Sequence, residues 1–381
     1  MSRDFLRQMP SAESHLRRGT GLAYRMHIDP ILLILLLILC CLGLAILYSA
    51  SGQSIVAVEK QLLRFGLAFL VLIVFAQLDP ATYRRWSPWL FCLGVFALVA
   101  VLLFGTGAKG AQRWLHLPGV PRFQPSEFMK LVVPMMIAWF LSSRFLPPSF
   151  ENIIVALVLI LIPVLLIVKQ PDLGTSILIA VSGIFVVMFS GISWKLVFGF
   201  GAAIASFAPI MWLFVMHDYQ KQRVLTFLDP ESDPLGSGWN IIQSKIAIGS
   251  GGLWGKGWLE GTQSHLNFLP ESHTDFIIAV YGEEFGFVGL CGLLLLYMLI
   301  VFRGLYIATR AQDSYGRLLA GSLIMTFFIY VFVNIGMVTG ILPVVGVPLP
   351  LVSYGGTSAV TLMASFGVLM SIHTHRKVHS R

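Results

Sequence analysis

Long apolar runs, separated by short polar segments, dominate this chain. Runs long enough to cross about 30 Å of hydrocarbon as helices recur from residue 31 to residue 371. Their spacing predicts ten membrane helices, at 31–49, 62–77, 89–104, 128–143, 153–168, 173–190, 195–214, 276–302, 319–340 and 351–371. We therefore expect an all-α polytopic membrane protein.

The composition supports this fold class. Of the 381 residues, 56% are hydrophobic and 12% are charged, whereas soluble domains carry about 25% charged residues. The net charge of +8 then favours cytoplasmic anchoring and anionic lipid over nucleic acid. All four cysteines lie inside apolar runs, so we predict neither a disulfide nor a zinc site (Cys40, Cys41, Cys92 and Cys291).

An even number of spans places both termini on one side of the membrane. More than half of the Lys and Arg residues fall on that side if the N-terminus is cytoplasmic, as the positive-inside rule requires. We expect a basic tail (1–29), one membrane domain (30–372) and a second cytoplasmic tail (373–381). A cleaved signal peptide is the alternative for the first run, but its apolar part would span only about 7–15 residues.

This topology leaves a long extracytoplasmic loop, 215–275, between the seventh and eighth helices. Within it, WNIIQSKIAIG sets Trp239, Ile242 and Ile246 at helical spacing. That pattern predicts a helix lying either in the membrane interface or on the protein itself. The glycine-rich segment 249–258 predicts tight turns and close backbone approach. It lacks the Lys-Ser/Thr ending of a P-loop, which excludes that mode of nucleotide binding.

Charged residues gather where several helices meet the outer face. Glu127 and Lys130 begin the fourth helix, Asp172 begins the sixth, and Asp275 begins the eighth. Each has a structural explanation: Ser126 as an N-cap with a Glu127–Lys130 pair behind it, and aspartates or Thr274 capping the other helices. Ionisable groups near a membrane are nevertheless costly, and they mark function unless they pair.

Glu283 and Glu284 lie too deep in the eighth helix to cap it. We expect them to form a buried pair or an internal polar network.

A carboxylate beside lysines at a membrane surface suits transfer from a lipid-linked phosphorylated donor. The carboxylate would act as general base on a hydroxyl, and the cations would hold the departing diphosphate. An ion-coupled lipid transporter fits the same composition. The residues alone do not decide between the two.

Five segments are similar to the signatures of the SEDS family, the shape, elongation, division and sporulation glycosyltransferases with ten membrane helices. They are GAQRWLHLPGVPRFQPSEFMKL (110–131), KQPDLGTS (169–176), GWNIIQSKIAIGSGGLWGKGW (238–258), FLPESHTDFIIAVYGEEFG (268–286) and GILPVVGVPLPLVSYGGTS (340–358). The amino-acid sequences of the first and last segments resemble the elongation subfamily, RodA, more than the division subfamily, FtsW.

The resemblance implies an enzyme that polymerises lipid II into glycan strands during cell elongation. The essential acidic residue of the family falls on Asp275, the Glu and Lys of its QPSExxK block on Glu127 and Lys130, and its QPDLGT aspartate on Asp172. It also implies a class B penicillin-binding transpeptidase and other elongation-complex membrane proteins as partners.

The resulting hypothesis makes Asp275 the general base of an inverting transfer, with Glu271 and His273 tuning it. Besides Lys130, the candidate cations for the diphosphate are four residues of the outer loop: Lys221, Arg223, Lys245 and Lys256. We expect no organic cofactor. Mg²⁺ or Mn²⁺ remains open, with Glu127, Asp172 and Asp275 as candidate ligands.

Two rival functions remain: a lipid II flippase and a non-catalytic scaffold of the elongation machinery. A flippase predicts carboxylates along a path across the bilayer, and only Glu283 and Glu284 would support such a path. A scaffold has no need for the acidic and basic clustering.

Overall fold

The computed structural model describes residues 27–108, 111–114, 124–193, 237–262 and 272–375, with isolated positions between 195 and 225. Its helices are α2 (Pro30–Ala50), α3 (Ile55–Gln77), α4 (Pro80–Phe104), α5 (Pro125–Ser142), α6 (Phe150–Lys169), α7 (Leu173–Phe189), α10 (Ser237–Ser250), α12 (Ile277–Thr309), α13 (Ser314–Val338) and α14 (Thr357–Thr374). Two short strands, β1 (Thr106–Ala108) and β2 (Ala111–Trp114), pair in antiparallel orientation. The predicted all-α polytopic class is confirmed, and among the described residues six helices are long and apolar enough to cross a membrane.

Nine of the ten predicted helices correspond to a helix of the described residues. The remaining one, 195–214, lies mostly outside them. α3 and α4 begin earlier than predicted, because Ser54 and Asp79 cap them before their apolar runs start. α14 begins later, at Thr357, because residues 350–356 form turns.

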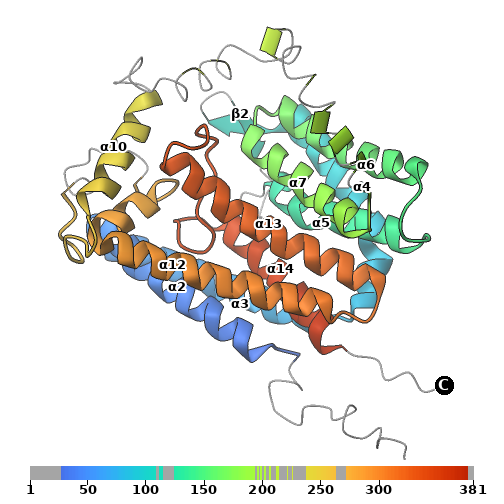
Figure 1. Cartoon of the computed structure of the whole chain (residues 1–381), viewed down its shortest axis with the longest axis horizontal. Coiled ribbons are helices and arrows are strands. Elements are labelled where there is room, and N and C mark those ends of the chain that lie inside the picture. The colour runs from blue at the N-terminus through green and yellow to red at the C-terminus, as the bar shows by residue number, and fades with distance from the viewer. Residues whose placement is uncertain are drawn as a thin grey trace, which may run out of the picture.

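α13 and α14 form the centre of the helical bundle (Figure 1). In their most apolar stretches 67% and 61% of the residues are buried, against 28–39% in the other candidate spans. α2, α3 and α12 pack together on one side, and α4 to α7 pack together on the other. The outer helices therefore expose their apolar faces, as lipid-facing helices do.

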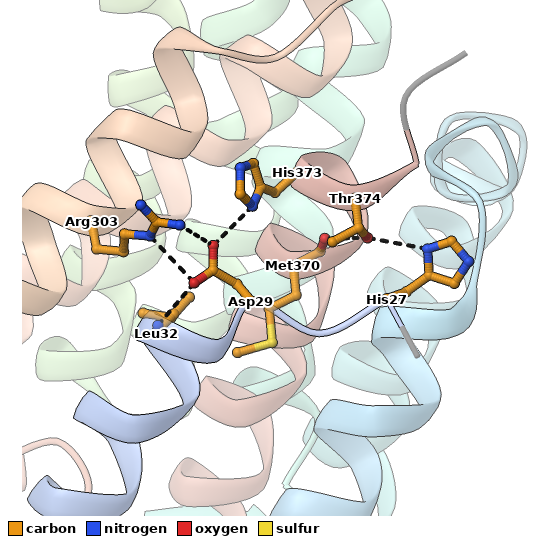
Figure 2. Close-up of polar contacts among 7 residues, drawn as sticks. All are labelled: His27, Asp29, Leu32, Arg303, Met370, His373 and Thr374. Atoms are coloured by element: carbon orange, nitrogen blue, oxygen red, sulfur yellow. Dashed lines mark hydrogen bonds and ion pairs between the residues drawn. The ribbon is translucent and has the colours of Figure 1, made fainter. Parts of the chain in front are cut away.

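The start of α2 is tied to the ends of α12 and α14 by what we call the Asp29 cluster, formed by Asp29, Arg303 and His373 (Figure 2). Asp29 is 1% exposed. Its Oδ1 accepts from the Leu32 amide at 3.0 Å and from Arg303 Nε at 3.3 Å. Its Oδ2 lies 2.6 Å from an Arg303 Nη and 2.8 Å from His373 Nδ1. Both carboxylate oxygens thus have two partners.

The environment of Asp29 shifts its acidity. Burial raises the pKa of the carboxyl, but hydrogen bonds from His373, Arg303 and the Leu32 amide outweigh it and hold the pKa well below its usual range. The carboxylate stays ionised and serves as a fixed structural anion.

α12 is interrupted at Gly286, whose φ of 64° and ψ of −165° are not helical. The glycine-rich loop of residues 251–257 fills this break. The amides of Lys256 and Gly257 donate to the carbonyls of Glu283 and Glu284, each at 3.0 Å. The amides of residues 287 and 288 donate to the carbonyls of residues 252 and 253, at 2.9 and 3.1 Å. The predicted close backbone approach is confirmed, because a Cβ on Gly251 or Gly255 would collide with α12 carbonyls.

The two glutamates inside α12 form the internal polar network that the sequence predicted. Glu283 is fully buried, and its Oε1 accepts from Lys256 Nζ at 2.7 Å and from the Thr262 amide at 2.8 Å. Glu284 accepts a hydrogen bond from Ser49 at the end of α2. These contacts join residues 256–262 and α2 to the break in α12.

α10 packs on α12 and α13, so the alternative of a helix lying on the protein holds. The face of Trp239, Ile242 and Ile246 is not the one that packs on these helices, because Ile246 is 47% exposed. The buried face instead carries Ile241, Ser244 and Ala247. Ser244 Oγ satisfies its burial by donating to the carbonyl of residue 338 at 2.8 Å, at the end of α13.

Candidate functional site

A cavity of about 330 Å³ lies where α3, α5, α7 and α13 meet the segment before α14. Its lining carries four charged residues: Arg64, Glu127, Lys130 and Asp172. Tyr330, Gly346 and residues 354–358 complete much of the rest. Three of the predicted site residues therefore share one cavity.

Glu127 and Lys130 form the predicted ion pair, with 2.5 Å between Lys130 Nζ and Glu127 Oε1. Both residues are 8% exposed. Lys130 Nζ also lies 4.9 Å from the centre of the Tyr330 ring, a cation–π distance. Glu127 Oε2 is buried and has no hydrogen-bond partner among the residues that the structure describes. A buried acceptor left unpaired is costly, so this oxygen is suited to a ligand.

The start of α5 differs from the prediction. Its N-cap is Gln124, without a side-chain cap bond, and Pro125 is the first helical residue. Ser126 lies inside the first turn and accepts from Gln124 Nε2 at 3.0 Å, so the Ser126 cap is wrong. Proline fits the first helical position, where its missing amide costs nothing.

Asp172 is the N-cap of α7, as predicted, and its Oδ1 accepts from the Thr175 amide at 3.3 Å. Its second oxygen, Oδ2, lies 3.5 Å from Gln124 Nε2 at the start of α5. The carboxylate therefore holds two helix ends together while it lines the cavity.

Asp275 lies in a turn, 272–276, just before α12. The N-cap of α12 is Phe276, so the predicted cap at Asp275 or Thr274 is wrong. Two side chains hold the main chain of the turn. Ser353 Oγ donates to the Thr274 carbonyl at 2.5 Å, and Asn334 Nδ2 donates to the Asp275 carbonyl at 2.9 Å. These bonds fix the turn to α13 and to the segment before α14.

The Asp275 side chain borders the cavity at Gly346. Its Oδ2 lies 3.6 Å from the position that a Cβ would take on Gly346, a residue with φ of 72° that lines the cavity. Asp275 itself is absent from the lining. Within the described ranges no three acidic, His or Cys side chains converge as a metal cluster, so the carboxylates do not form an all-protein cation cage.

The other predicted site residues lie around this centre. The carbonyl of His273 accepts from the Tyr354 amide at 2.9 Å, and the two rings meet edge to face at 6.0 Å. Lys245 lies against Gly340, and Lys256 is bonded to Glu283; neither lines the cavity. Glu271 lies outside the described residues.

Sequence reasoning missed three residues of the site. Arg64 lines the cavity from α3, Tyr330 contacts Lys130, and Asn334 holds both the Asp275 turn and the carbonyl of Val347, the latter at 2.8 Å. Arg64 and Asn334 are polar residues inside predicted spans, which was a usable signal. Tyr330 carried no signal that separates it from core aromatic residues.

The fold and the cavity define a polytopic helical membrane protein with a charged cavity at its helix ends. The chain belongs to the FtsW/RodA/SpoVE family, described as cell cycle proteins, which matches residues 30–378. It is 57% identical to the peptidoglycan glycosyltransferase MrdB of Escherichia coli K12, over 94% of this chain and 96% of that protein. It is 37% identical to the probable peptidoglycan glycosyltransferase FtsW of Trichlorobacter lovleyi, over 92% and 94%.

Solved structures show the same fold. One belongs to a study of the structural coordination of polymerization and crosslinking by a peptidoglycan synthase complex; it covers 93% of this chain and 98% of that chain, with 32% identity and a TM-score of 0.80. The crystal structure of the rod shape determining protein RodA of Thermus thermophilus covers 92% and 98%, with 27% identity and a TM-score of 0.69. The resemblance seen in the sequence is therefore confirmed.

Proposed function

We propose that this protein is a peptidoglycan glycosyltransferase that polymerises lipid II into glycan strands for cell elongation. The observation that carries the proposal is the cavity, which gathers Glu127, Lys130 and Asp172 and is bordered by Asp275. The family match covers residues 30–378, so the whole site lies within it.

Asp275 is the general base in this proposal. Its carboxylate takes the proton from the 4-hydroxyl of the acceptor's N-acetylglucosamine. That oxygen forms a bond to the anomeric carbon of the donor's muramic sugar, and the bond from this carbon to the diphosphate oxygen breaks with inversion. The main-chain contacts of residues 272–276 support the role, because a base must be held within hydrogen-bond reach of its proton.

Glu127 and Lys130 line the region where the donor would bind. The Lys130 ammonium, already between Glu127 and Tyr330, adds positive potential near the departing diphosphate. The unpartnered Glu127 Oε2 is suited to a sugar hydroxyl. Asp172 holds the starts of α5 and α7 in place.

A Mg²⁺ or Mn²⁺ ion fits this set of donors when substrate phosphates complete it. Hard cations in such sites bind one or two carboxylates together with phosphate oxygens, and Glu127 and Asp172 line one cavity. A bound ion would offset charge on the diphosphate. Asp172→Asn, which keeps the helix cap, should raise the Mg²⁺ concentration needed for half-maximal turnover; an unchanged Mg²⁺ dependence would exclude Asp172 as a ligand.

We assign the protein to the inner membrane with both termini cytoplasmic and the cavity at the outer face. The charge asymmetry of the chain supports this orientation. The Asp29 cluster then lies at the cytoplasmic end of the bundle. A class B penicillin-binding transpeptidase and other membrane proteins of the elongation complex are the proposed partners, in line with the synthase complex found among the structural neighbours.

The test is polymerisation of labelled lipid II by the purified protein, with and without a partner transpeptidase. Asp275→Asn should lower turnover by about 10²- to 10⁴-fold, the usual contribution of a general base. The matched control is Asp79→Asn, since Asp79 caps α4 away from the cavity and asparagine caps equally well. Undiminished glycan strands from Asp275→Asn would exclude the general-base role.

A further inference from the structure

Arg64 is the cavity residue whose role remains open. It lies on α3, one turn after the buried Gln61, and it is half-buried. Its guanidinium carbon lies 4.3 Å from the centre of the Tyr354 ring. One guanidinium nitrogen donates to Gln61 Oε1 at 3.4 Å. The side chain is thus fixed in position by neutral groups.

Glycines at positions 355 and 356 leave space for the Arg64 side chain. A Cβ on Gly356 would lie 3.2 Å from Arg64 Cδ and 3.3 Å from its Nε. Gln61 in turn holds Gly355: its Nε2 donates to the Gly355 carbonyl at 3.2 Å, and its Oε1 accepts from the Gly355 amide at 3.3 Å. The Arg64 side chain therefore packs closely against Gly356, and Gly355 is hydrogen-bonded to Gln61, on the surface that lines the cavity.

The charges in the cavity differ in how far they are neutralised. Lys130 has a carboxylate at 2.5 Å, so its charge is largely compensated. Arg64 forms no ion pair with any residue that the structure describes. Among the described residues that line the cavity, the arginine is thus the cation without a counter-ion, and a guanidinium fork binds phosphate oxygens in pairs.

Further features of the cavity suit a phosphorylated ligand with hydroxyl groups. Thr357 and Ser358, in the first turn of α14, line the cavity beside Arg64, and this helix start has no side-chain cap. Free amides at a helix start favour anions. The nine-tenths buried Glu127, with its unpartnered Oε2, faces the same cavity and can accept from a hydroxyl.

We propose that Arg64 binds the diphosphate of the prenyl-linked substrate, while Gln61 and Tyr354 position its guanidinium. This inference rests on the proposed function, since it assigns the diphosphate of that same substrate to a residue. Lys130 then acts on the reacting sugar end of the diphosphate rather than as its main anchor.

The experiment measures inhibition of lipid II polymerisation by three added lipids: undecaprenyl diphosphate, undecaprenyl phosphate and phosphatidylglycerol. In the wild-type protein the diphosphate should inhibit most strongly. Arg64→Gln should raise KM for lipid II and the inhibition constant of undecaprenyl diphosphate by about 10- to 100-fold, the effect of losing a charged hydrogen bond. It should also bring the constants of the diphosphate and the monophosphate together.

Two variants separate binding from folding. Arg64→Lys keeps the charge but loses the fork, so it should recover part of the discrimination between diphosphate and monophosphate. Lys60→Gln removes an exposed cation from the same helix one turn earlier, and it should behave as wild type. A merely structural arginine would lower the amount of folded protein without changing the ratio of the two inhibition constants.

The outcomes also separate this inference from the proposed function. If the wild type polymerises lipid II and Arg64→Gln leaves the ratio unchanged, the assignment of Arg64 is overturned and the glycosyltransferase stands. If phosphatidylglycerol inhibits as strongly as the diphosphate, Arg64 serves a lipid headgroup and the proposal is also overturned. If the wild type makes no polymer, direct binding of labelled undecaprenyl diphosphate decides: Arg64-dependent binding keeps the assignment, and Arg64-independent binding overturns it.

Discussion

The cavity and the Asp29 cluster both contain a buried acidic residue near the start of a helix, yet their chemistry differs. At Asp29, both carboxylate oxygens have two partners each (Figure 2). At Glu127, one oxygen binds Lys130, and the other has no partner within the described part of the chain. The cavity lies at the first turn of α14 and His373 in its last turn, about 25 Å apart at 1.5 Å per residue.

This difference separates structural charge from functional charge. A buried ion whose hydrogen-bonding capacity is used up by the protein stabilises one packing arrangement, and its loss leaves a partner uncompensated. A buried ion with an unused oxygen beside a cavity has capacity left for a ligand. Substitutions at the two places should therefore change different measurements.

In the comparison of the cavity with the Asp29 cluster, the largest effect should come from removing one cation at each place. Lys130→Met should lower turnover of lipid II by about 100- to 1,000-fold, since it removes electrostatic stabilisation next to the proposed reacting centre. Arg303→Met should leave turnover per folded molecule unchanged and lower the stability. Turnover and unfolding in SDS, measured on both variants, check this; unchanged turnover at saturating substrate in Lys130→Met would remove Lys130 from transition-state stabilisation.

The next effect concerns the stability that the Asp29 cluster provides. Asp29→Asn should lower the free energy of unfolding by about 3 kcal/mol, because Arg303 loses its buried counter-ion. Combining it with Arg303→Met should add little more, since the two residues share one interaction. A double variant as unstable as the sum of the two single variants would mean that they act independently.

A smaller effect should follow from glycine substitution next to Asp275. Gly346→Ala strains a residue with φ of 72° by about 1–2 kcal/mol, and its methyl group would also contact the Asp275 carboxylate. We expect turnover to fall by up to about tenfold through misplacement of the proposed base. Gly52→Ala is the control, because φ there is 65° and nothing lies within 4 Å. Equal turnover in the two variants would show that the contact with Asp275 is irrelevant.

The smallest effect is a pH dependence confined to the Asp29 cluster. Burial raises the pKa of Asp29, but its hydrogen bonds hold the pKa below the usual value. The stabilisation should therefore be complete above about pH 4, the pKa of an unfolded aspartate, and be lost as the pH falls through the lower, folded value. The measurement is the free energy of unfolding that Asp29→Asn removes, followed against pH in a His373→Gln background so that the neighbouring imidazole does not titrate. The difference in unfolding free energy between the two variants should be constant at neutral pH and become smaller only in acid. A difference that already changes near neutral pH would contradict the lowered pKa of Asp29.

Apolar run length predicted nearly all of the fold, because membrane helices must satisfy their own backbone hydrogen bonds. The helix starts were less predictable. Ser54 and Asp79 begin α3 and α4 in polar sequence that hydropathy discounts. The turns of residues 350–356 before α14 come from tertiary contacts, such as Tyr354 on the His273 carbonyl.

The site was predicted as a set of charges at one face, and the structure brings Glu127, Lys130 and Asp172 into one cavity. What the sequence could not supply was the pairing of those charges. Lys256 carries the same charge as Arg64, yet it is bonded to Glu283 while Arg64 lines the cavity. Whether a cation has a carboxylate beside it depends on contacts between residues far apart in the chain. The hydropathy pattern does not predict such contacts.

The break in α12 has a consequence for anyone who modifies this protein. Surface loops usually accept insertions at little cost. Residues 251–257 should not, because their amides and carbonyls bond in register with residues 283–288 and glycines make the approach possible. A fluorescent tag or epitope placed there would split a membrane helix from its hydrogen-bonding partner. Residues 51–53, between α2 and α3, lie in an exposed turn with open space around Gly52, and they offer the better position for a label.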